Sequence, residues 1–168
     1  MDSWQTSAPR GRRPLGFSMM ELLAVMAIIA ILAALAVPSM MERIVRNQIV
    51  EAAQLTDIAK KPVAAAWSAA AVLPLDNAAA GLPSAEKIVS NHVSALTVEA
   101  GAIHLRFGNS AHGAIMGKTL TLRPAVVEGS PVVPVAWVCG AASAPNQMTP
   151  RGENRTDVAL RYLPLNCR

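Results

Sequence analysis

The sequence predicts an α+β fold in which a long N-terminal helix packs on a four-stranded antiparallel sheet. Three observations lead to this prediction. Residues 22–41 carry no charge, residues 41–59 repeat apolar side chains every three or four positions, and residues 96–139 contain short segments in which apolar and polar side chains alternate. With 168 residues, the chain has the length of about one domain.

The uncharged segment from Leu22 to Met41 is long enough to cross a membrane. At a rise of about 1.5 Å per residue, it would form a helix as long as the hydrocarbon core of a bilayer is thick. Three arginines within residues 10–13 precede it, whereas Glu42 and Arg43 cancel each other after it. The positive-inside rule therefore keeps the N-terminus in the cytoplasm and exports the rest of the chain.

Three interpretations compete for this segment: a permanent anchor of a single-span envelope protein, a secretory signal, and a processed leader followed by a helix. Small residues at Ala34-Leu35-Ala36 are typical of a secretory cleavage site, and a cut after Ala36 would release a binding domain that begins at Val37. Glu21 fits a secretory signal poorly. A carboxylate costs about 2–3 kcal/mol at the centre of a bilayer, and less toward its edge.

A third interpretation comes from the residues around Gly16. Gly16 followed by Phe17, with Glu21 as the fifth residue after the glycine and an apolar helix beyond, resembles the leader of type IV pilins and related pseudopilins. The resemblance implies that a prepilin peptidase cuts between Gly16 and Phe17 and methylates the new amine of Phe17. It also implies a leader over residues 1–16, a transmembrane and filament-core helix over 17–41, and a globular pilin domain over 42–168.

The resemblance further implies the partners and the location of the protein. The subunit would cross the inner membrane once, meet the pilus assembly machinery there, and then assemble with its own copies into a helical extracellular filament. Such filaments serve adhesion, motility or DNA uptake.

Glu21 has a physical role in such a filament. There the amine of Phe17 would lie in a medium of low dielectric constant, and the Glu21 carboxylate of an adjacent subunit would neutralise it. Removing one partner of a buried ion pair costs about 3–5 kcal/mol, so we expect Glu21 to select the correct register of assembly. The alternative is a glutamate whose carboxylate simply remains among lipid headgroups.

The helix is expected to continue past Pro38, which should bend it without ending it. Pro62 should kink or stop it, residues 63–71 could resume it, and Pro74 sets its limit. Residues 73–91 read as loop with one short helical turn at 84–87. The residues expected to pack on the domain are Met41, Ile44, Val45, Gln48, Ala52, Leu55 and Ala59.

Four strands are expected after this loop. Residues 96–98 and 103–107 should form a hairpin that turns at 99–102, followed by strands over 117–122 and 132–139. Pro131 and Pro134 indicate an edge or an irregular start for the last strand. The connections are too short for crossover helices, so the sheet should be antiparallel.

Two cysteines remain, Cys139 and Cys167. In an exported chain an even pair predicts a disulfide, which would close a C-terminal loop of 27 residues. The segments Trp137–Cys139 and Tyr162–Arg168 resemble the disulfide-bounded end of major type IVa pilins, a loop that secretion pseudopilins usually lack. The resemblance thus implies the type IV pilin fold and favours a pilus subunit, with a minor pilin or a pseudopilin of a secretion or competence system as the alternative.

The sequence offers little to other function classes. The net charge is +4, but the lysine and arginine residues form no basic stripe with interleaved aromatic residues. The sequence also contains no nucleophile elbow, phosphate loop or paired carboxylates. His92, His104 and His112 lack the spacing of metal ligands, and His104 is expected on the polar face of a strand. We therefore expect no enzyme, cofactor or metal. The arginines of the C-terminal loop suggest contact with DNA or a host surface, or simply a solvated face; they are Arg151, Arg155, Arg161 and Arg168.

Overall fold

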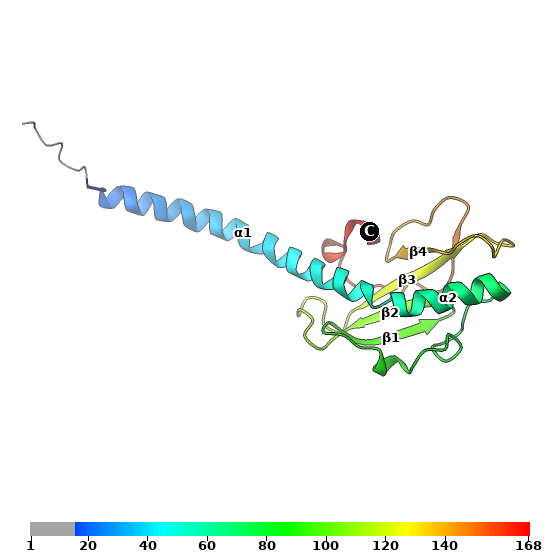
Figure 1. The fold of residues 1–168 in the computed structure, drawn as a ribbon. Helices are drawn as coiled ribbons and strands as arrows, with labels where there is room; N and C mark the ends of the chain where they lie inside the picture. The colour runs from blue at the N-terminus through cyan, green and yellow to red at the C-terminus, as the bar shows by residue number, and fades with distance from the viewer. Residues whose placement is uncertain (1–15) are drawn as a thin grey trace, which may run out of the picture. The chain divides into compact units, whose positions relative to one another are not determined.

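The computed structural model describes residues 16–168 and divides the chain into two compact units (Figure 1). The first unit ends at Pro38, and the second is Ser39–Arg168. The helices are α1 (Met19–Gln54), α2 (Asp57–Ala70) and three short 3-10 helices, η1 (Ala85–Lys87), η2 (Leu160–Tyr162) and η3 (Leu165–Cys167). The strands are β1 (Val93–Glu99), β2 (Ala102–Phe107), β3 (Thr119–Val126), β4 (Ala136–Cys139) and β5 (Thr149–Pro150).

The long helical stretch is interrupted at Leu55 and Thr56, and Pro62 does not stop it, which was one of the two outcomes expected at that proline. α1 continues through Pro38, as expected, and Pro62 lies inside α2. The N–H groups of Leu55 and Thr56 bond to carbonyls three residues back, and the buried Thr56 hydroxyl donates to the Ala53 carbonyl at 2.6 Å. This side-chain bond competes with the regular helical ladder, which explains a bend at this position.

The helix face that packs on the sheet matches the predicted face at Val45, Ala52 and Ala59 but not at every position. Ile49 is fully buried although it was not expected to be, whereas Met41 and Ile44 are about half exposed. The buried residues are spaced three or four positions apart through the bend, so one buried stripe continues from α1 into α2. The buried residues of this stripe are Val45, Ile49, Ala52, Thr56, Ala59, Val63 and Trp67.

The sheet has the order β1-β2-β3-β4 with antiparallel neighbours, which confirms the predicted topology. β1 and β2 are joined by Ala100 and Gly101, both at positive φ, which is the geometry that a two-residue hairpin turn of type I′ requires. The last predicted strand is shorter than expected, because residues 132–135 precede β4 without joining it. A fifth, two-residue strand, β5, was not predicted and pairs with the end of β3.

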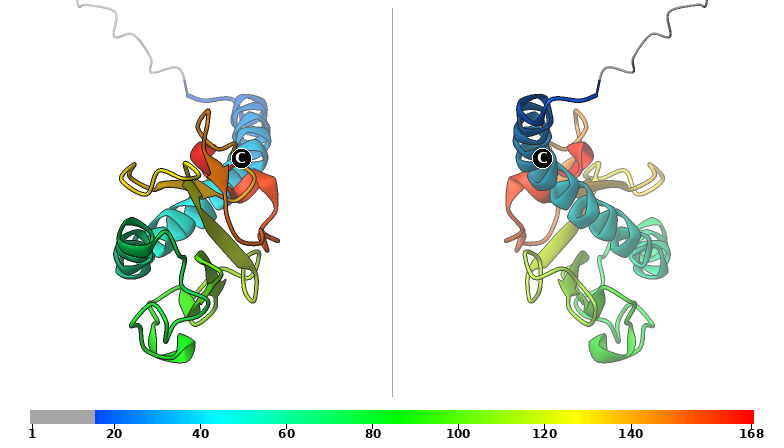
Figure 2. Two further views of the ribbon diagram at one scale, coloured as in Figure 1. Left: turned by 90° about the vertical axis from the view of Figure 1, so that its right-hand side faces the viewer. Right: turned by 90° about the vertical axis from the view of Figure 1, so that its left-hand side faces the viewer.

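The two faces of the sheet are covered by different parts of the chain. Ala59 and Val63 of the buried helical stripe share one core with Leu96, Ile103 and other apolar strand residues. On the opposite side the segment after β5 crosses the sheet, and Figure 2 shows this orange segment on the far side of the strands from α2. Both faces of the sheet are therefore shielded from solvent over β2 and β3.

The strand pattern predicted that His104 lies on a solvated polar face. This prediction is wrong, because the segment after β5 covers that face. His104 is 6% exposed, and its Nδ1 lies 2.9 Å from the Thr121 hydroxyl oxygen. That oxygen also accepts a hydrogen bond from the backbone N–H of Arg155 in the covering segment. Burial lowers the pKa of His104 below its ordinary value, and the charge of Arg155 lowers it further.

The segment between α2 and β1 is anchored by Asn77. Its amide nitrogen donates to the carbonyls of Pro83 and Leu96, and its carbonyl oxygen accepts from the N–H of Val98. Leu96 and Val98 belong to β1, an edge strand of the sheet. Asn77 therefore satisfies edge groups that would otherwise be open to pairing with another strand.

Candidate assembly site

The first unit presents apolar side chains to solvent over its whole described length. Nine large apolar residues between Leu22 and Leu35 are each at least 46% exposed. The most apolar 18-residue stretch of α1 has a mean hydropathy of 2.7, enough for α1 to cross a membrane by length and composition. Full burial of a side chain of this kind stabilises by about 1.5–3 kcal/mol, so covering this surface is worth on the order of 10 kcal/mol.

The three predicted processing and assembly residues lie together at the start of this helix. Phe17 is 79% exposed, and apart from its chain neighbours no atom of residues 16–168 lies within 4 Å of the position that a side chain at Gly16 would occupy. Glu21 stands exposed in the first turn of α1. The bond between Gly16 and Phe17 is thus open to a protease, and the carboxylate lies four residues from the amine that a cut would create.

Ser18 also belongs to this group, and the sequence interpretation missed it. Its hydroxyl oxygen accepts a hydrogen bond from the N–H of Met20 at 3.3 Å, as at a helix N-cap. Glu21 follows Ser18 by three residues, which is the spacing of a capping box and the signal that could have identified it. A carboxylate in the first helical turn also interacts favourably with the helix dipole, so Glu21 has a local role in addition to the one predicted for it in assembly.

The second unit contains the predicted disulfide between Cys139 and Cys167. Both cysteines are buried, and the carbonyl of Cys167 accepts a hydrogen bond from the N–H of Ala141. The loop that they close is further held to β1 by Arg155, whose guanidinium makes two hydrogen bonds to the Glu99 carboxylate, at 2.6 and 2.7 Å. The disulfide thus fixes both ends of the segment that covers the outer face of the sheet.

The four arginines of this loop divide into two kinds. Arg151 pairs with Glu128, and Arg155 pairs with both Glu99 and Glu153. In contrast, Arg161 and Arg168 have no carboxylate side chain within ion-pair distance among the residues that the structure describes. Only the second pair therefore offers positive charge that is not already neutralised.

No described part of the chain resembles a catalytic or metal centre. Among residues 16–168, no group of three or more His, Cys, Asp or Glu side chains is placed to hold a metal ion. The three histidines stay apart: His104 contacts Thr121, His92 lies 3.4 Å from Glu51, and the N–H of His112 bonds to a helical glutamine.

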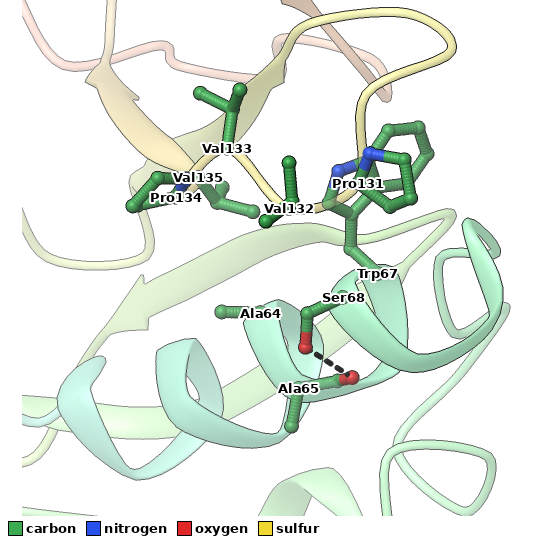
Figure 3. A pocket seen from close by; sticks show the side chains of 9 residues that line it. All are labelled: Ala64, Ala65, Trp67, Ser68, Pro131, Val132, Val133, Pro134 and Val135. Carbon is green, nitrogen blue, oxygen red and sulfur yellow. Dashed lines mark hydrogen bonds between the residues drawn. The ribbon is translucent and has the colours of Figure 1, made fainter.

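The hollow of about 350 Å³ between α2 and residues 131–135 is apolar (Figure 3). In Figure 3 the Trp67 side chain rises from α2 toward Pro131, and the nearby hydroxyl of Ser68 bonds to the backbone of Ala65. This hollow contains no ionisable group, so it offers no acid–base chemistry.

Comparison with known proteins decides the family. A family model described as pilin of a bacterial filament matches residues 45–168, more than half of the chain. The chain belongs to the pilin family. A model of the prokaryotic N-terminal methylation motif matches residues 11–37 of this pilin, the region that contains Gly16, Phe17 and Glu21.

The pilin is also similar to curated proteins over most of its length. It is 31% identical over 159 residues to the type IV major pilin protein PilE of Neisseria gonorrhoeae, covering 91% of this chain and 93% of that protein. It is 31% identical to the fimbrial protein EcpC of Eikenella corrodens, covering 91% and 90%. A fimbrial protein of Neisseria meningitidis is 29% identical over 162 residues, covering 91% and 93%.

These findings confirm the prediction of a type IV pilus structural subunit. The alternatives of a minor pilin or pseudopilin, and of a binding domain secreted by cleavage after Ala36, are not favoured. The family and the methylation motif also support self-assembly into pili and prepilin processing.

Proposed function

We propose that this pilin is made as a prepilin, cut by prepilin peptidase between Gly16 and Phe17, and methylated on the new amine of Phe17. One observation carries the proposal: an exposed apolar helix directly follows an accessible bond between a glycine and a phenylalanine. In this scheme residues 1–16 are the leader, 17–41 are the transmembrane and filament-core helix, and 42–168 are the globular domain. The protein itself acts as a structural element and performs no catalysis.

The exposed apolar helix needs two successive environments. The first is the inner membrane, which the subunit crosses once, with its globular domain on the outer side. The second is the core of the extracellular filament, where the same side chains pack against helices of other subunits after the inner-membrane assembly machinery has extracted them. Each environment removes the same apolar surface from water, so the transfer between them costs little hydrophobic free energy.

Glu21 directs the second step. In the filament core its carboxylate neutralises the methylated amine of Phe17 in an adjacent subunit, because an unpaired charge of either sign is costly in a low dielectric. The same pair is absent from an isolated subunit in the membrane. Glu21 therefore acts on assembly and leaves processing unaffected.

Mass spectrometry of sheared surface filaments tests the processing step. We expect a chain that begins at N-methylated Phe17, with an intact mass that rises by the mass of two hydrogen atoms on reduction of the Cys139–Cys167 disulfide. A chain that begins at Val37 or at Met1 would contradict the proposal. The variant Gly16→Ala should accumulate uncut in the membrane, because the peptidase then meets a side chain at the cleavage position.

A matched pair of variants tests the role of Glu21. Glu21→Gln keeps the size of the side chain and removes its charge, so it should be processed normally and yet yield at least tenfold fewer filaments. Ser18→Ala weakens the helix start by about 1 kcal/mol and leaves the charge in place, so filament yield should stay within about twofold. Equal losses in both variants would show that Glu21 acts as a helix cap, and normal filaments from Glu21→Gln would contradict the assembly role.

A further inference from the structure

Four arginines gather where the C-terminal segment meets the second half of α1, and we call Arg43, Arg46, Arg161 and Arg168 the arginine surface. The Nη2 of Arg46 donates to the carbonyl oxygen of Arg161 at 3.0 Å, and the Nη2 of Arg168 donates to the same oxygen at 3.3 Å. Arg43 stands exposed one turn before Arg46. Figure 1 shows the red C-terminal turns beside this part of α1.

The positive charge of the arginine surface is not balanced within the described part of the chain. None of its four guanidinium groups has a carboxylate side chain within ion-pair distance among residues 16–168. The acidic residue nearest to it in the sequence is Glu42, directly before Arg43. The guanidinium groups of Arg46 and Arg168 donate to the same carbonyl oxygen. Holding two guanidinium groups this close without counter-charges is unfavourable, and an external anion would relieve the repulsion.

Exposed apolar side chains accompany these arginines. Leu160 and Leu165 are 61% and 82% exposed, and each belongs to one of the two C-terminal 3-10 helices. Between them the Arg161 guanidinium lies 5.6 Å from the centre of the Tyr162 ring. Arginine, tyrosine and exposed leucine side chains together are typical of surfaces that rest in the headgroup region of a bilayer.

The chain itself brings the arginine surface close to the membrane. Arg43 and Arg46 follow Met41, the end of the apolar segment, by two and five residues. Because α1 is helical through Gln54, these residues lie only about 3 and 8 Å further along its axis. Arg161 and Arg168 are tied to Arg46 by the shared carbonyl, so they occupy the same level.

We propose that the arginine surface binds the phosphates of anionic phospholipids in the outer leaflet of the inner membrane before the subunit enters a filament. This inference rests on the membrane stage of the proposed function. The headgroup phosphates supply the missing negative charge, while Leu160 and Leu165 enter the boundary between headgroups and hydrocarbon. The contact holds the globular domain against the bilayer and must be released when the subunit is extracted.

The test uses the full-length protein reconstituted into vesicles of phosphatidylcholine, with or without one quarter phosphatidylglycerol. Flotation first shows whether the chain is inserted. Phenylglyoxal, which modifies free guanidinium groups, is then applied, and mass spectrometry follows the rate at each arginine. We expect phosphatidylglycerol to slow modification of Arg161 and Arg168 at least fivefold each, and to leave Arg151 unchanged, since that arginine already pairs with Glu128. High salt should remove the difference.

Two variants with the same change in charge separate this contact from a general effect of charge. Leu165→Glu places a negative charge beside the arginine surface, so the modification rate of Arg161 should become the same in both lipids. Val132→Glu places the same charge at a residue that is 88% exposed in the loop before β4, and it should behave as the parent protein. Equal effects of both variants would overturn the proposal.

The remaining outcomes distinguish this inference from the proposed function. If the chain floats with the vesicles but Arg161 and Arg168 react equally in both lipids, the inference alone is wrong. If modification of Arg161 and Arg168 slows with protein density and not with lipid charge, the arginine surface contacts other copies of the chain. That result would overturn the proposed contact with lipid. If the chain fails to float, the membrane stage of the proposed function is wrong, and the inference falls with it.

Discussion

Removal of the disulfide tests how the C-terminal segment is held. In the variant Cys139→Ala/Cys167→Ala the loop keeps its contacts but loses its covalent closure. Of residues 141–166, only Val158 and Leu163 are buried, so little apolar packing remains to replace the bond. Closing a loop whose ends are 28 residues apart restricts the unfolded chain by about 3–4 kcal/mol in the chain-entropy treatment. We expect the free energy of unfolding to fall by that amount.

Urea unfolding of the full-length protein in detergent micelles, followed by tryptophan fluorescence, measures this change. With a denaturant dependence of about 2 kcal/mol per molar, the midpoint should fall by about 2 M. A reductant should lower the midpoint of the parent protein similarly and leave that of the double variant unchanged. A loss below about 1 kcal/mol would refute the reasoning, because it would show that the hydrogen bonds of the segment, including those from Arg155 to Glu99, hold it without the covalent bond.

Three further predictions concern the same domain and are checked by the same unfolding measurement. Ile49→Ala should destabilise the domain by about 2–5 kcal/mol because the side chain is fully buried. Ile44→Ala, at a half-exposed position five residues earlier, should change the free energy of unfolding by less than about 1 kcal/mol. Gly140→Ala should destabilise the domain by more than about 1 kcal/mol, because φ is +56° and the added carbon would lie 2.6 Å from the carbonyl oxygen of Cys167; a stability equal to that of the parent would contradict the described turn. Burial lowers the pKa of His104, so the unfolded chain binds the proton more readily than the folded chain. The free energy of unfolding should therefore fall as pH drops below about 6.5, by at most about 1.4 kcal/mol per pH unit. His104→Gln should reduce this slope between pH 7.5 and pH 5, and an unchanged slope would assign it to other groups.

The local features of the fold could be predicted from the sequence because each depends on neighbouring residues. An uncharged apolar run forms a helix that needs a nonpolar environment wherever it lies, and strand alternation with a short Ala-Gly turn encodes a hairpin. The spacing of Gly16, Phe17 and Glu21 is likewise a local signal, which is why it can be read without the fold. The role of Ser18 at the start of α1 is also a local signal, because Glu21 follows it at the spacing of a capping box.

Other features depend on segments that are distant in the sequence. The burial of His104 follows from a loop about fifty residues later that crosses the outer face of the sheet, whereas the strand pattern alone assigned that face to solvent. The helical stretch is interrupted at Thr56, where a buried hydroxyl donates to a backbone carbonyl, whereas α2 runs through Pro62. The preference for Ile49 over Ile44 was set by which side of α1 the sheet covers.

The sequence by itself therefore determined the two parts of this pilin, an apolar helix and a disulfide-closed α+β domain, together with the bond expected to be cut. Only the tertiary structure decided which helix face is buried, which polar residues lose solvent, and which charges are paired. Arg161 and Arg168 show the physical reason. A charged side chain is neutralised or left free according to what the fold places within a few ångströms of it, and sequence spacing carries no information about that distance.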